Sequence, residues 1–240
     1  MQRWLAQGLI LIAVVVASIG ALVWINQQQN CQKVSLLFIG NSHTYGHDMP
    51  NLLAELAAAG EPRYCLEIET VVEGGASLAK HWQDGVGLQA LQRQQWQYVV
   101  LQERSLGPIE DPQGFQQAAS RWMQTIRQQG ATPVLFVTWA REYAPEQQAQ
   151  INAAYAQTAG QQAILVKVGA AWQQVRQRDR SIALYEPDQN HATLNGAYLT
   201  ACVFYTTLLR PPSQSLPNLT DLPDAQAQYL QQVAWDVTQN

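Results

Sequence analysis

Short apolar runs alternate with longer stretches of helical spacing from about residue 33 onward. The apolar runs are rich in aliphatic and β-branched residues and predict five strands, over residues 33–39, 65–72, 98–101, 132–138 and 164–168. Proline at the start or glycine past the end bounds most of the helical stretches, which predict helices over residues 50–59, 112–129, 145–158, 194–209 and 225–237. Strands that are apolar on both faces and connected through helices are typical of a parallel sheet covered on both sides. We therefore expect one three-layer α/β/α domain over residues 33–240.

The first 25 residues differ from the rest of the chain. Residues 4–25 are apolar apart from Gln7 and Ser18, with Arg3 ahead of them and no further charge until Lys33. As a helix this stretch would extend about 33 Å, which is close to the thickness of a hydrocarbon core. The sequence predicts a transmembrane signal-anchor in residues 1–25 and a polar linker in residues 26–32.

The charge pattern also predicts an orientation. A basic flank stays in the cytoplasm, so the domain is expected in the periplasm or at the cell exterior, attached to the membrane through its N-terminus. Cleavage after the small residues 17–21 would instead secrete the domain. The apolar run continues to Ile25, however, and is longer than the core of most signal peptides, which favours the uncleaved anchor.

Composition excludes several classes of function. Charged residues make up 13% of the chain, about half of the usual share, and the net charge is −4. Nucleic-acid binding needs clustered basic residues and is not expected. The chain has neither Gly-x-Gly-x-x-Gly nor Gly-Lys-Ser/Thr, which argues against dinucleotide and P-loop sites. Of three cysteines, Cys31 and Cys65 are able to pair in an oxidising compartment, although the sequence leaves both states open. Cys202 lies in an apolar stretch and is expected to be buried.

Two separated segments carry residues suited to nucleophilic catalysis. Gly40-Asn41-Ser42 follows the first predicted strand, and Asp188 and His191 stand three apart in a predicted loop. A serine hydroxyl needs a base, imidazole has a suitable pKa, and a carboxylate on the second ring nitrogen fixes the tautomer. The alternative interpretation is that Ser42 belongs to a turn, Asp188 caps a helix and His191 is exposed in its first turn.

These segments resemble the first and last motif blocks of the SGNH hydrolases, also called GDSL esterases. The second block of that family is a glycine after the second strand, where this chain has Gly74 and Gly75. The third follows the third strand and normally carries asparagine, where this chain has Gln102. Residues 33–209 further resemble a bacterial branch with Gly-Asn-Ser in its first block and Leu-Gln-Glu in its third.

The resemblance implies a flavodoxin-like sheet of order 2-1-3-4-5 and hydrolysis of an ester through an acyl-enzyme. Ser42 would attack the carbonyl, His191 would transfer the proton, and Asp188 would orient His191. Neither a metal nor an organic cofactor is implied. By analogy with the family, a short acyl group on a carbohydrate, acetyl in the simplest case, is the expected substrate.

The resemblance also implies an oxyanion hole built from the backbone N–H groups of Ser42 and Gly75 and the side-chain amide of Gln102. Gly74 competes with Gly75 for this role. The chain departs from the family pattern at Asn41, where aspartate is usual, and at Gln102, whose side chain is one methylene longer than asparagine.

Residues after the fourth predicted strand are expected to rim the same site. Trp139, Arg141 and Tyr143 are candidate substrate-binding residues, although a packed aromatic ring and a solvated arginine explain them equally well. A metal site at His43 and His47 would need a helix, which the nearby glycine and proline disfavour.

A second class of function is consistent with the same fold. The chain would then be a non-catalytic, membrane-tethered ligand-binding protein. The unusual Gln102 permits this hypothesis, whereas the presence of Ser42, Asp188 and His191 together argues against it.

Overall fold

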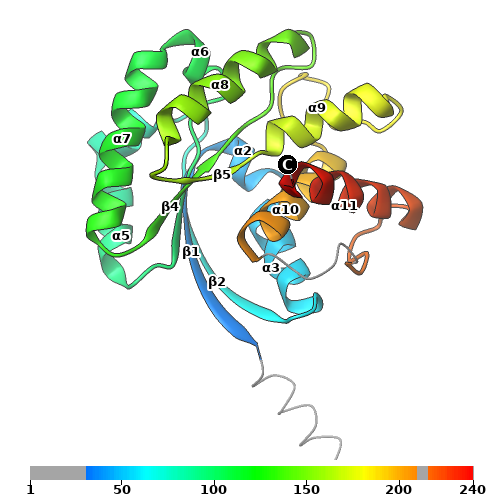
Figure 1. The fold of residues 1–240 in the computed structure, drawn as a ribbon, viewed down its shortest axis with the longest axis horizontal. Coiled ribbons are helices and arrows are strands. Elements are labelled where there is room, and N and C mark those ends of the chain that lie inside the picture. Colours follow the sequence, from blue (N-terminus) through cyan, green and yellow to red (C-terminus); the bar gives the residue numbers. More distant parts are fainter. Residues whose placement is uncertain (1–30, 210–215, 240) are drawn as a thin grey trace, which may run out of the picture. The chain divides into compact units, whose positions relative to one another are not determined.

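A five-stranded sheet organises the domain in the computed structural model, which describes residues 31–209 and 216–239 (Figure 1). The strands are β1 (Gln32–Gly40), β2 (Tyr64–Val72), β3 (Tyr98–Leu101), β4 (Thr132–Phe136) and β5 (Ile164–Val166). Their order is β2-β1-β3-β4-β5, as expected. The pairs β1–β3, β3–β4 and β4–β5 are parallel, so the carboxyl ends of these strands meet at one edge.

Helices cover both faces of the sheet. Alternate strand residues point to opposite sides, so apolar side chains face both helical layers. Leu36 and Phe38 of β1 belong to one apolar cluster and Leu37 and Ile39 to the other. The first cluster includes residues of α3 (Met49–Ala59), α9 (Val168–Arg178), α10 (Leu194–Leu209) and α11 (Asp224–Gln239). The second includes residues of α4 (Leu78–Asp84), α5 (Val86–Arg93), α7 (Pro112–Gln128) and α8 (Gln148–Ala159). Two short helices, α2 (Ser42–Tyr45) and α6 (Gly107–Glu110), and the 3-10 turns Gly46–Asp48 and Pro145–Gln147 lie in the connections.

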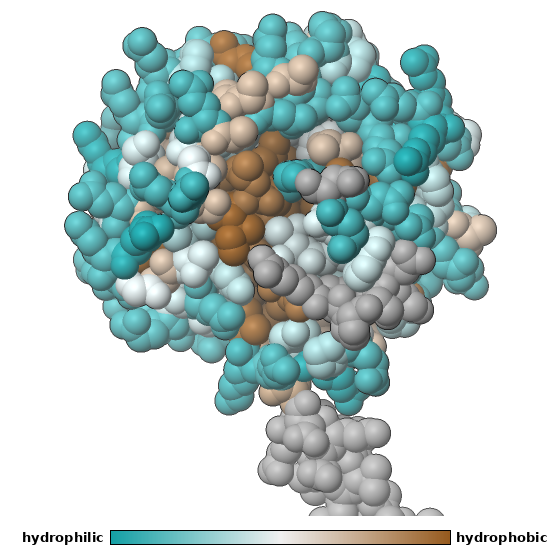
Figure 2. Space-filling model, viewed as in Figure 1, coloured by the Kyte–Doolittle hydropathy of each residue, from teal (hydrophilic) through white to brown (hydrophobic). Residues whose placement is uncertain are grey.

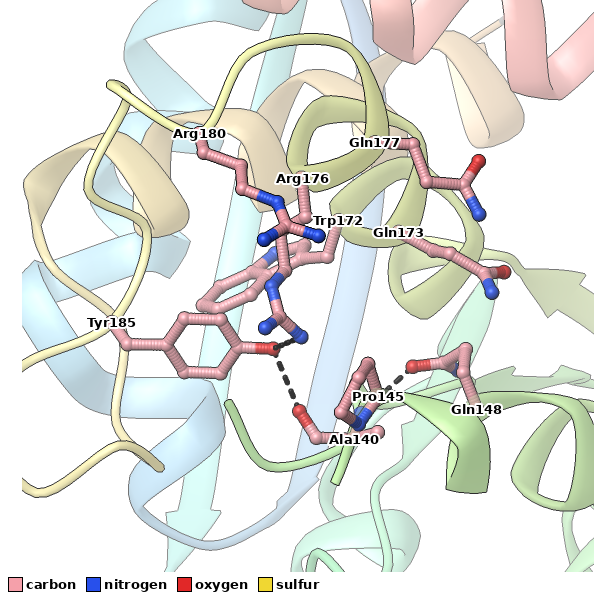
Figure 3. Close-up of a pocket in the computed structure, with 9 residues that line it drawn as sticks. All are labelled: Ala140, Pro145, Gln148, Trp172, Gln173, Arg176, Gln177, Arg180 and Tyr185. Atoms are coloured by element: carbon pink, nitrogen blue, oxygen red, sulfur yellow. Dashed lines mark hydrogen bonds between the residues drawn. The ribbon is translucent and has the colours of Figure 1, made fainter. Parts of the chain in front are cut away.

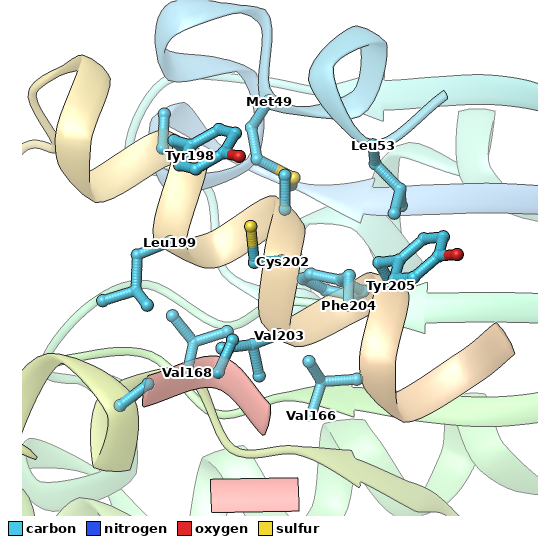
Figure 4. Packing of buried hydrophobic residues seen from close by; sticks show 14 of the residues in the cluster. Met49, Leu53, Val166, Val168, Tyr198, Leu199, Cys202, Val203, Phe204 and Tyr205 are labelled. Carbon is cyan, nitrogen blue, oxygen red and sulfur yellow. The ribbon is translucent and has the colours of Figure 1, made fainter. Parts of the chain in front are cut away.

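Helix α10 is the central helix of the first cluster (Figure 4). Thirteen of its sixteen residues are buried, because α3, α9 and α11 pack around it. Helices that are apolar on every side occur in protein cores. The buried hydroxyls of its threonines are satisfied within the helix, as where Thr200 Oγ1 donates to the carbonyl of Gly196 at 2.8 Å. Cys202 is a free, buried thiol within this helix, as expected.

The sequence did not predict α4, α5 or α9. Helix α9 buries Val168, Ala171, Trp172 and Val175, which have the i, i+3, i+4, i+7 spacing of an amphipathic helix. The predicted fifth strand was extended into its first residue, and β5 ends at Val166 instead. Polar residues separate Trp172 from Val175 in the sequence and follow Val175 to the end of the helix, which leaves α9 only a short apolar pattern.

The described surface is mainly polar. Figure 2 shows polar residues over most of one face, with apolar residues gathered in a strip near its middle. Within residues 31–209 and 216–239, no helix is long and apolar enough to cross a bilayer. The expected transmembrane segment and nearly all of the expected linker lie outside these residues. Cys31 and Cys65 are both disulfide-bonded.

Candidate active site

The nucleophile candidate Ser42 is the first residue of α2, directly after the carboxyl end of β1. Contacts between the ends of β1 and β3 hold this turn in place. The backbone N–H of Asn41 and the hydroxyl of Thr44 both donate to Oε1 of Gln102, at 2.8 and 3.0 Å. A side chain at Gly40 would place its Cβ 2.7 Å from that oxygen, so only glycine fits there. The turn is therefore fixed by packing before any substrate arrives.

Ser42 meets the candidate base across the site. Its Oγ lies 2.8 Å from Nε2 of His191. The other ring nitrogen of His191 is hydrogen-bonded to Oδ2 of Asp188, while the backbone N–H of His191 donates to Oδ1 of the same carboxylate at 2.9 Å. The hydrogen bond from the imidazole is the main reason that the pKa of Asp188 falls from 3.8 to about 2. The carboxylate is thus ionised and oriented towards the imidazole at neutral pH.

The loop that carries Asp188 and His191 is restrained from several sides. The indole N–H of Trp139 donates to the carbonyl of Asn190 at 2.8 Å, and the N–H of Glu142 donates to the carbonyl of Gln189 at 3.0 Å. Within the loop, the N–H of Glu186 donates to the carbonyl of His191 at 2.8 Å. Such supporting contacts hold a catalytic constellation in a productive geometry.

Stacked rings lie beneath the site. The ring of Trp139 is parallel to that of Trp172, with centroids 3.9 Å apart, and also stacks on His43 at 4.5 Å. His43 in turn meets the ring of His191 edge-on at 5.7 Å. Burial, followed by the charge of His191, lowers the pKa of His43 to about 3. His43 is therefore neutral and acts in packing, a role that the sequence analysis did not assign.

Backbone donors are available in the nucleophile turn and in the turn after β2. The turn after β2 is tied to the nucleophile, because the N–H of Glu73 donates to the carbonyl of Gly40 at 3.1 Å. Among the described residues, the N–H groups of Ser42, Gly74 and Gly75 have no protein acceptor. Gly75 has a φ of +70°, which favours glycine, whereas Gly74 does not have a positive φ. Free N–H groups at a tight turn are suitable donors to a developing oxyanion.

Solved structures of other proteins resemble the fold of this chain. No family model matches the sequence, and no curated protein matches it. A solved protein from Slackia heliotrinireducens, predicted to be an SGNH hydrolase, is 27% identical with a TM-score of 0.63, over 74% of this chain and 100% of its own. The chain belongs to the SGNH/GDSL superfamily.

Two further solved structures share the fold at lower identity. A DUF4886 family protein from Bacteroides uniformis is 18% identical with a TM-score of 0.70, over 86% of this chain and 95% of its own. An acetyl-xylooligosaccharide esterase variant from Geobacillus is 14% identical with a TM-score of 0.58, over 74% of this chain and 95% of its own. At these identities the likeness is evidence of the fold alone.

Gln102 departs from the superfamily pattern in its environment as well as its identity. The expectation that its amide donates to an oxyanion needs correction. Gln102 is completely buried, and its Nε2 donates to the carbonyl of Glu103 while its Oε1 accepts from Asn41 and Thr44. Both ends of the amide are occupied by protein partners. Gln102 therefore holds the nucleophile turn in place, and its amide is shielded from the substrate by burial.

Asn41 is the second departure from the superfamily pattern, and the structure gives it a specific contact. Its Nδ2 donates to the carbonyl of Ala76 at 2.9 Å, which ties the turn after β2 to the nucleophile turn. An aspartate has no N–H for this bond. Asparagine at this position therefore helps to set the separation between Ser42 and the backbone donors near Gly75.

The three candidate substrate-binding residues after β4 lie in different environments. Trp139 is 1% exposed, so it supports the loop from below, and the expectation of a substrate contact is corrected. Tyr143 is 66% exposed. Arg141 is partly buried, with Nη2 3.5 Å from Oγ of Ser105 and an Nε that is buried without a partner among the described residues. Arg141 and Tyr143 remain available to a ligand.

Proposed function

We propose that this carboxylic-ester hydrolase removes a short acyl group, acetyl in the simplest case, from a carbohydrate outside the cytoplasm. The observation that carries the proposal is the continuous hydrogen-bonded chain from Ser42 through His191 to Asp188. In this arrangement the imidazole activates the hydroxyl, and the carboxylate stabilises the imidazolium that forms.

The reaction follows from this geometry. Oγ of Ser42 attacks the ester carbonyl as its proton passes to Nε2 of His191, giving a tetrahedral oxyanion. The backbone N–H groups of Ser42 and Gly75, or Gly74 in place of Gly75, donate to the oxyanion. His191 then gives its proton to the leaving alcohol, which leaves an acyl-enzyme. Water, deprotonated by His191, attacks that ester and regenerates the serine.

The exposure of the site supports a bulky alcohol. The side chains of His191 and Asp188 are 41% and 48% exposed, so the leaving-group side is open enough for a sugar. An acetyl-xylooligosaccharide esterase has the same fold, and only by analogy with it do we propose the same class of substrate. Arg141 and Tyr143, beyond the end of β4, are proposed as contacts to the sugar.

The proposed location rests on two features. The apolar stretch at residues 4–25 is long enough to anchor the chain in a membrane. The disulfide-bonded state of Cys31 and Cys65 fits an oxidising compartment. Mass measurement of the mature protein tests the anchor, and a species that begins near residue 22 or later would contradict it.

A serine-directed fluorophosphonate probe separates an enzyme from a binding protein. We expect the wild-type chain to be labelled and Ser42→Ala to remain unlabelled, with both folded by circular dichroism. Equal labelling of the two would contradict the nucleophile assignment. Loss of hydrolysis in His191→Ala is a second requirement.

A panel of esters tests the substrate. We expect faster turnover of nitrophenyl acetate than of the octanoate, and hydrolysis of acetylated xylose oligomers. Preference for the long acyl chain, or activity on nitrophenyl esters with none on any acetylated sugar, would contradict the substrate and leave the mechanism standing.

A further inference from the structure

A small pocket lies outside the triad, between α9 and the segment that follows β4 (Figure 3). Its volume is about 90 Å³, close to that of three water molecules in the liquid. Its polar side chains include those of Arg176, Arg180, Gln173 and Gln177. Trp172 and Tyr185 are among its other lining residues. No acidic side chain is among its lining residues. The pocket is thus basic in a protein whose net charge is −4.

Arg176 is held in place by neutral groups. Its Nη2 donates to the carbonyl of Glu142 at 2.7 Å, and its guanidinium lies over the ring of Tyr185, 5.1 Å from the centroid. Among the described residues it has no carboxylate partner within ion-pair distance. Its charge is therefore fixed at the pocket and is not neutralised there.

Arg180 brings a second positive charge to the same pocket. Figure 3 shows its side chain extending in the same general direction as that of Arg176. Within the part of the chain that the structure describes, Arg180 makes no hydrogen bond or ion pair. Arg178, the last residue of α9, instead pairs with Asp236 at 3.4 Å, outside the pocket. Two guanidinium groups beside one small cavity repel each other unless an anion lies between them.

The remaining walls offer few acceptors to a ligand. Oε1 of Gln148 accepts from the N–H of Ala140 at 2.7 Å, and its Nε2 donates to the carbonyl of Thr138 at 3.1 Å. The hydroxyl of Tyr185 donates to the carbonyl of Ala140 at 2.7 Å. The groups that remain for a ligand are the two guanidinium groups and the amides of the nearby glutamines, so donors outnumber acceptors.

We propose that this pocket binds the oxyanion group of a small ligand, a phosphate or a carboxylate, between Arg176 and Arg180. Planar guanidinium groups bind such groups with two parallel hydrogen bonds. The pocket contains none of Ser42, Asp188 and His191, so the inference does not depend on the proposed esterase activity.

The bound anion would lie next to the residues that support the loop of Asp188 and His191. Trp172 stacks on Trp139, whose indole holds the loop at Asn190, and the ring of Tyr185 meets that of Trp172 at 4.8 Å. The ligand would contact the residues that support the loop without entering the triad. This placement distinguishes it from a subsite for the reacting ester.

Calorimetric titration of the full chain in detergent tests the site, with inorganic phosphate and glucuronate as separate probes and chloride holding the ionic strength constant. We expect saturable binding of at least one anion to wild-type protein. Arg180→Gln should weaken it by at least about tenfold, because a charge-assisted hydrogen bond is lost. Arg178→Gln removes the same charge two positions away, outside the pocket, and should bind as the wild type does.

The outcomes are distinct. Binding of glucuronate alone would identify a carboxylate ligand, and binding of phosphate alone a phosphorylated one. Absence of saturable binding by both anions overturns the proposal, as does equal weakening by Arg178→Gln and Arg180→Gln. Arg180 is exposed and beyond the end of α9, so its substitution should leave the fold intact. Arg176→Gln is expected to weaken binding further.

Discussion

Oγ of Ser42 lies 2.8 Å from Nε2 of His191, although 149 positions separate the two residues in the chain. The contact exists because β1 delivers the serine to the carboxyl edge of the sheet and Trp139, after β4, holds the loop of the histidine at that edge. The hydroxyl and its base are thus positioned by different parts of the fold.

The carboxylate of Asp188 should matter more for catalysis than for folding. Asp188→Asn keeps the size of the side chain but favours the wrong tautomer of His191, so kcat should fall by about 10⁴-fold. Kinetics on nitrophenyl acetate measure this effect. A loss below about tenfold would remove Asp188 from the mechanism.

The same carboxylate predicts a pH dependence of stability. The pKa of Asp188 is lowered from 3.8 to about 2, so its hydrogen bonds stabilise the fold above pH 4 and are lost as the pH falls towards 2. Urea midpoints of wild-type protein and Asp188→Asn should therefore converge over that range. A difference between the two urea midpoints that stays constant from pH 6 to pH 2 would contradict this explanation.

His43 predicts a dependence in a higher range. Its pKa falls from 6.5 to about 3 because the ring is buried, so between these values the unfolded chain binds a proton that the folded one excludes. In this range the free energy of unfolding should decrease as the pH is lowered, by up to about 1.4 kcal/mol per pH unit. His43→Phe keeps a ring against Trp139 and should flatten this slope in urea denaturation. His47→Gln, at an exposed position, is the control and should leave it unchanged.

Substitution of Gln102 distinguishes a structural role from an oxyanion role. Gln102→Ala leaves the N–H of Asn41 and the hydroxyl of Thr44 buried without an acceptor, which should lower the free energy of unfolding by about 2–5 kcal/mol. An oxyanion donor would behave differently. An unchanged urea midpoint together with a loss of about 10²–10³-fold in kcat would restore the oxyanion role.

The turn after β2 offers a matched pair of variants. Gly75→Ala forces a side chain into a φ of +70° and should cost about 1–2 kcal/mol of stability while displacing a backbone donor. A Cβ at Gly74 would meet only the hydroxyl of Tyr45 at an ordinary 3.5 Å, so Gly74→Ala should change stability by less than about 0.5 kcal/mol. Urea midpoints and kcat of both variants test this, and a larger effect on both quantities at Gly74 would reverse the assignment.

Much of this architecture could be predicted because strong local patterns specified it. The apolar runs from residue 33 to 168 predicted the five strands, and the resemblance to the SGNH hydrolases implied the sheet order and the residues that meet at its edge. The missed helix α9 shows the limit of this approach. Its buried positions include Gly169, where a Cβ would lie 2.3 Å from the carbonyl of Thr138, and this constraint is visible only in three dimensions.

The details of the site depended on contacts that no local pattern encodes. Gln102 could be aligned with a motif block, but whether its amide faced the substrate or the protein depended on where the N–H of Asn41 lay. In the same way, Trp139 after a strand suggested a rim residue. Its burial follows from Trp172 of a helix that the sequence did not predict.

The amide of Gln102 joins the ends of β1 and β3 through partners at three positions, all of them shielded from water. Replacement of this glutamine alone would leave those partners without a hydrogen bond, so the side chains at positions 44 and 102 should change together during evolution. Among descendants of a common ancestor, a shorter residue at 102 should appear together with a changed residue at 44. The evolutionary history of the turn is in this way constrained by a single side chain that never meets the substrate.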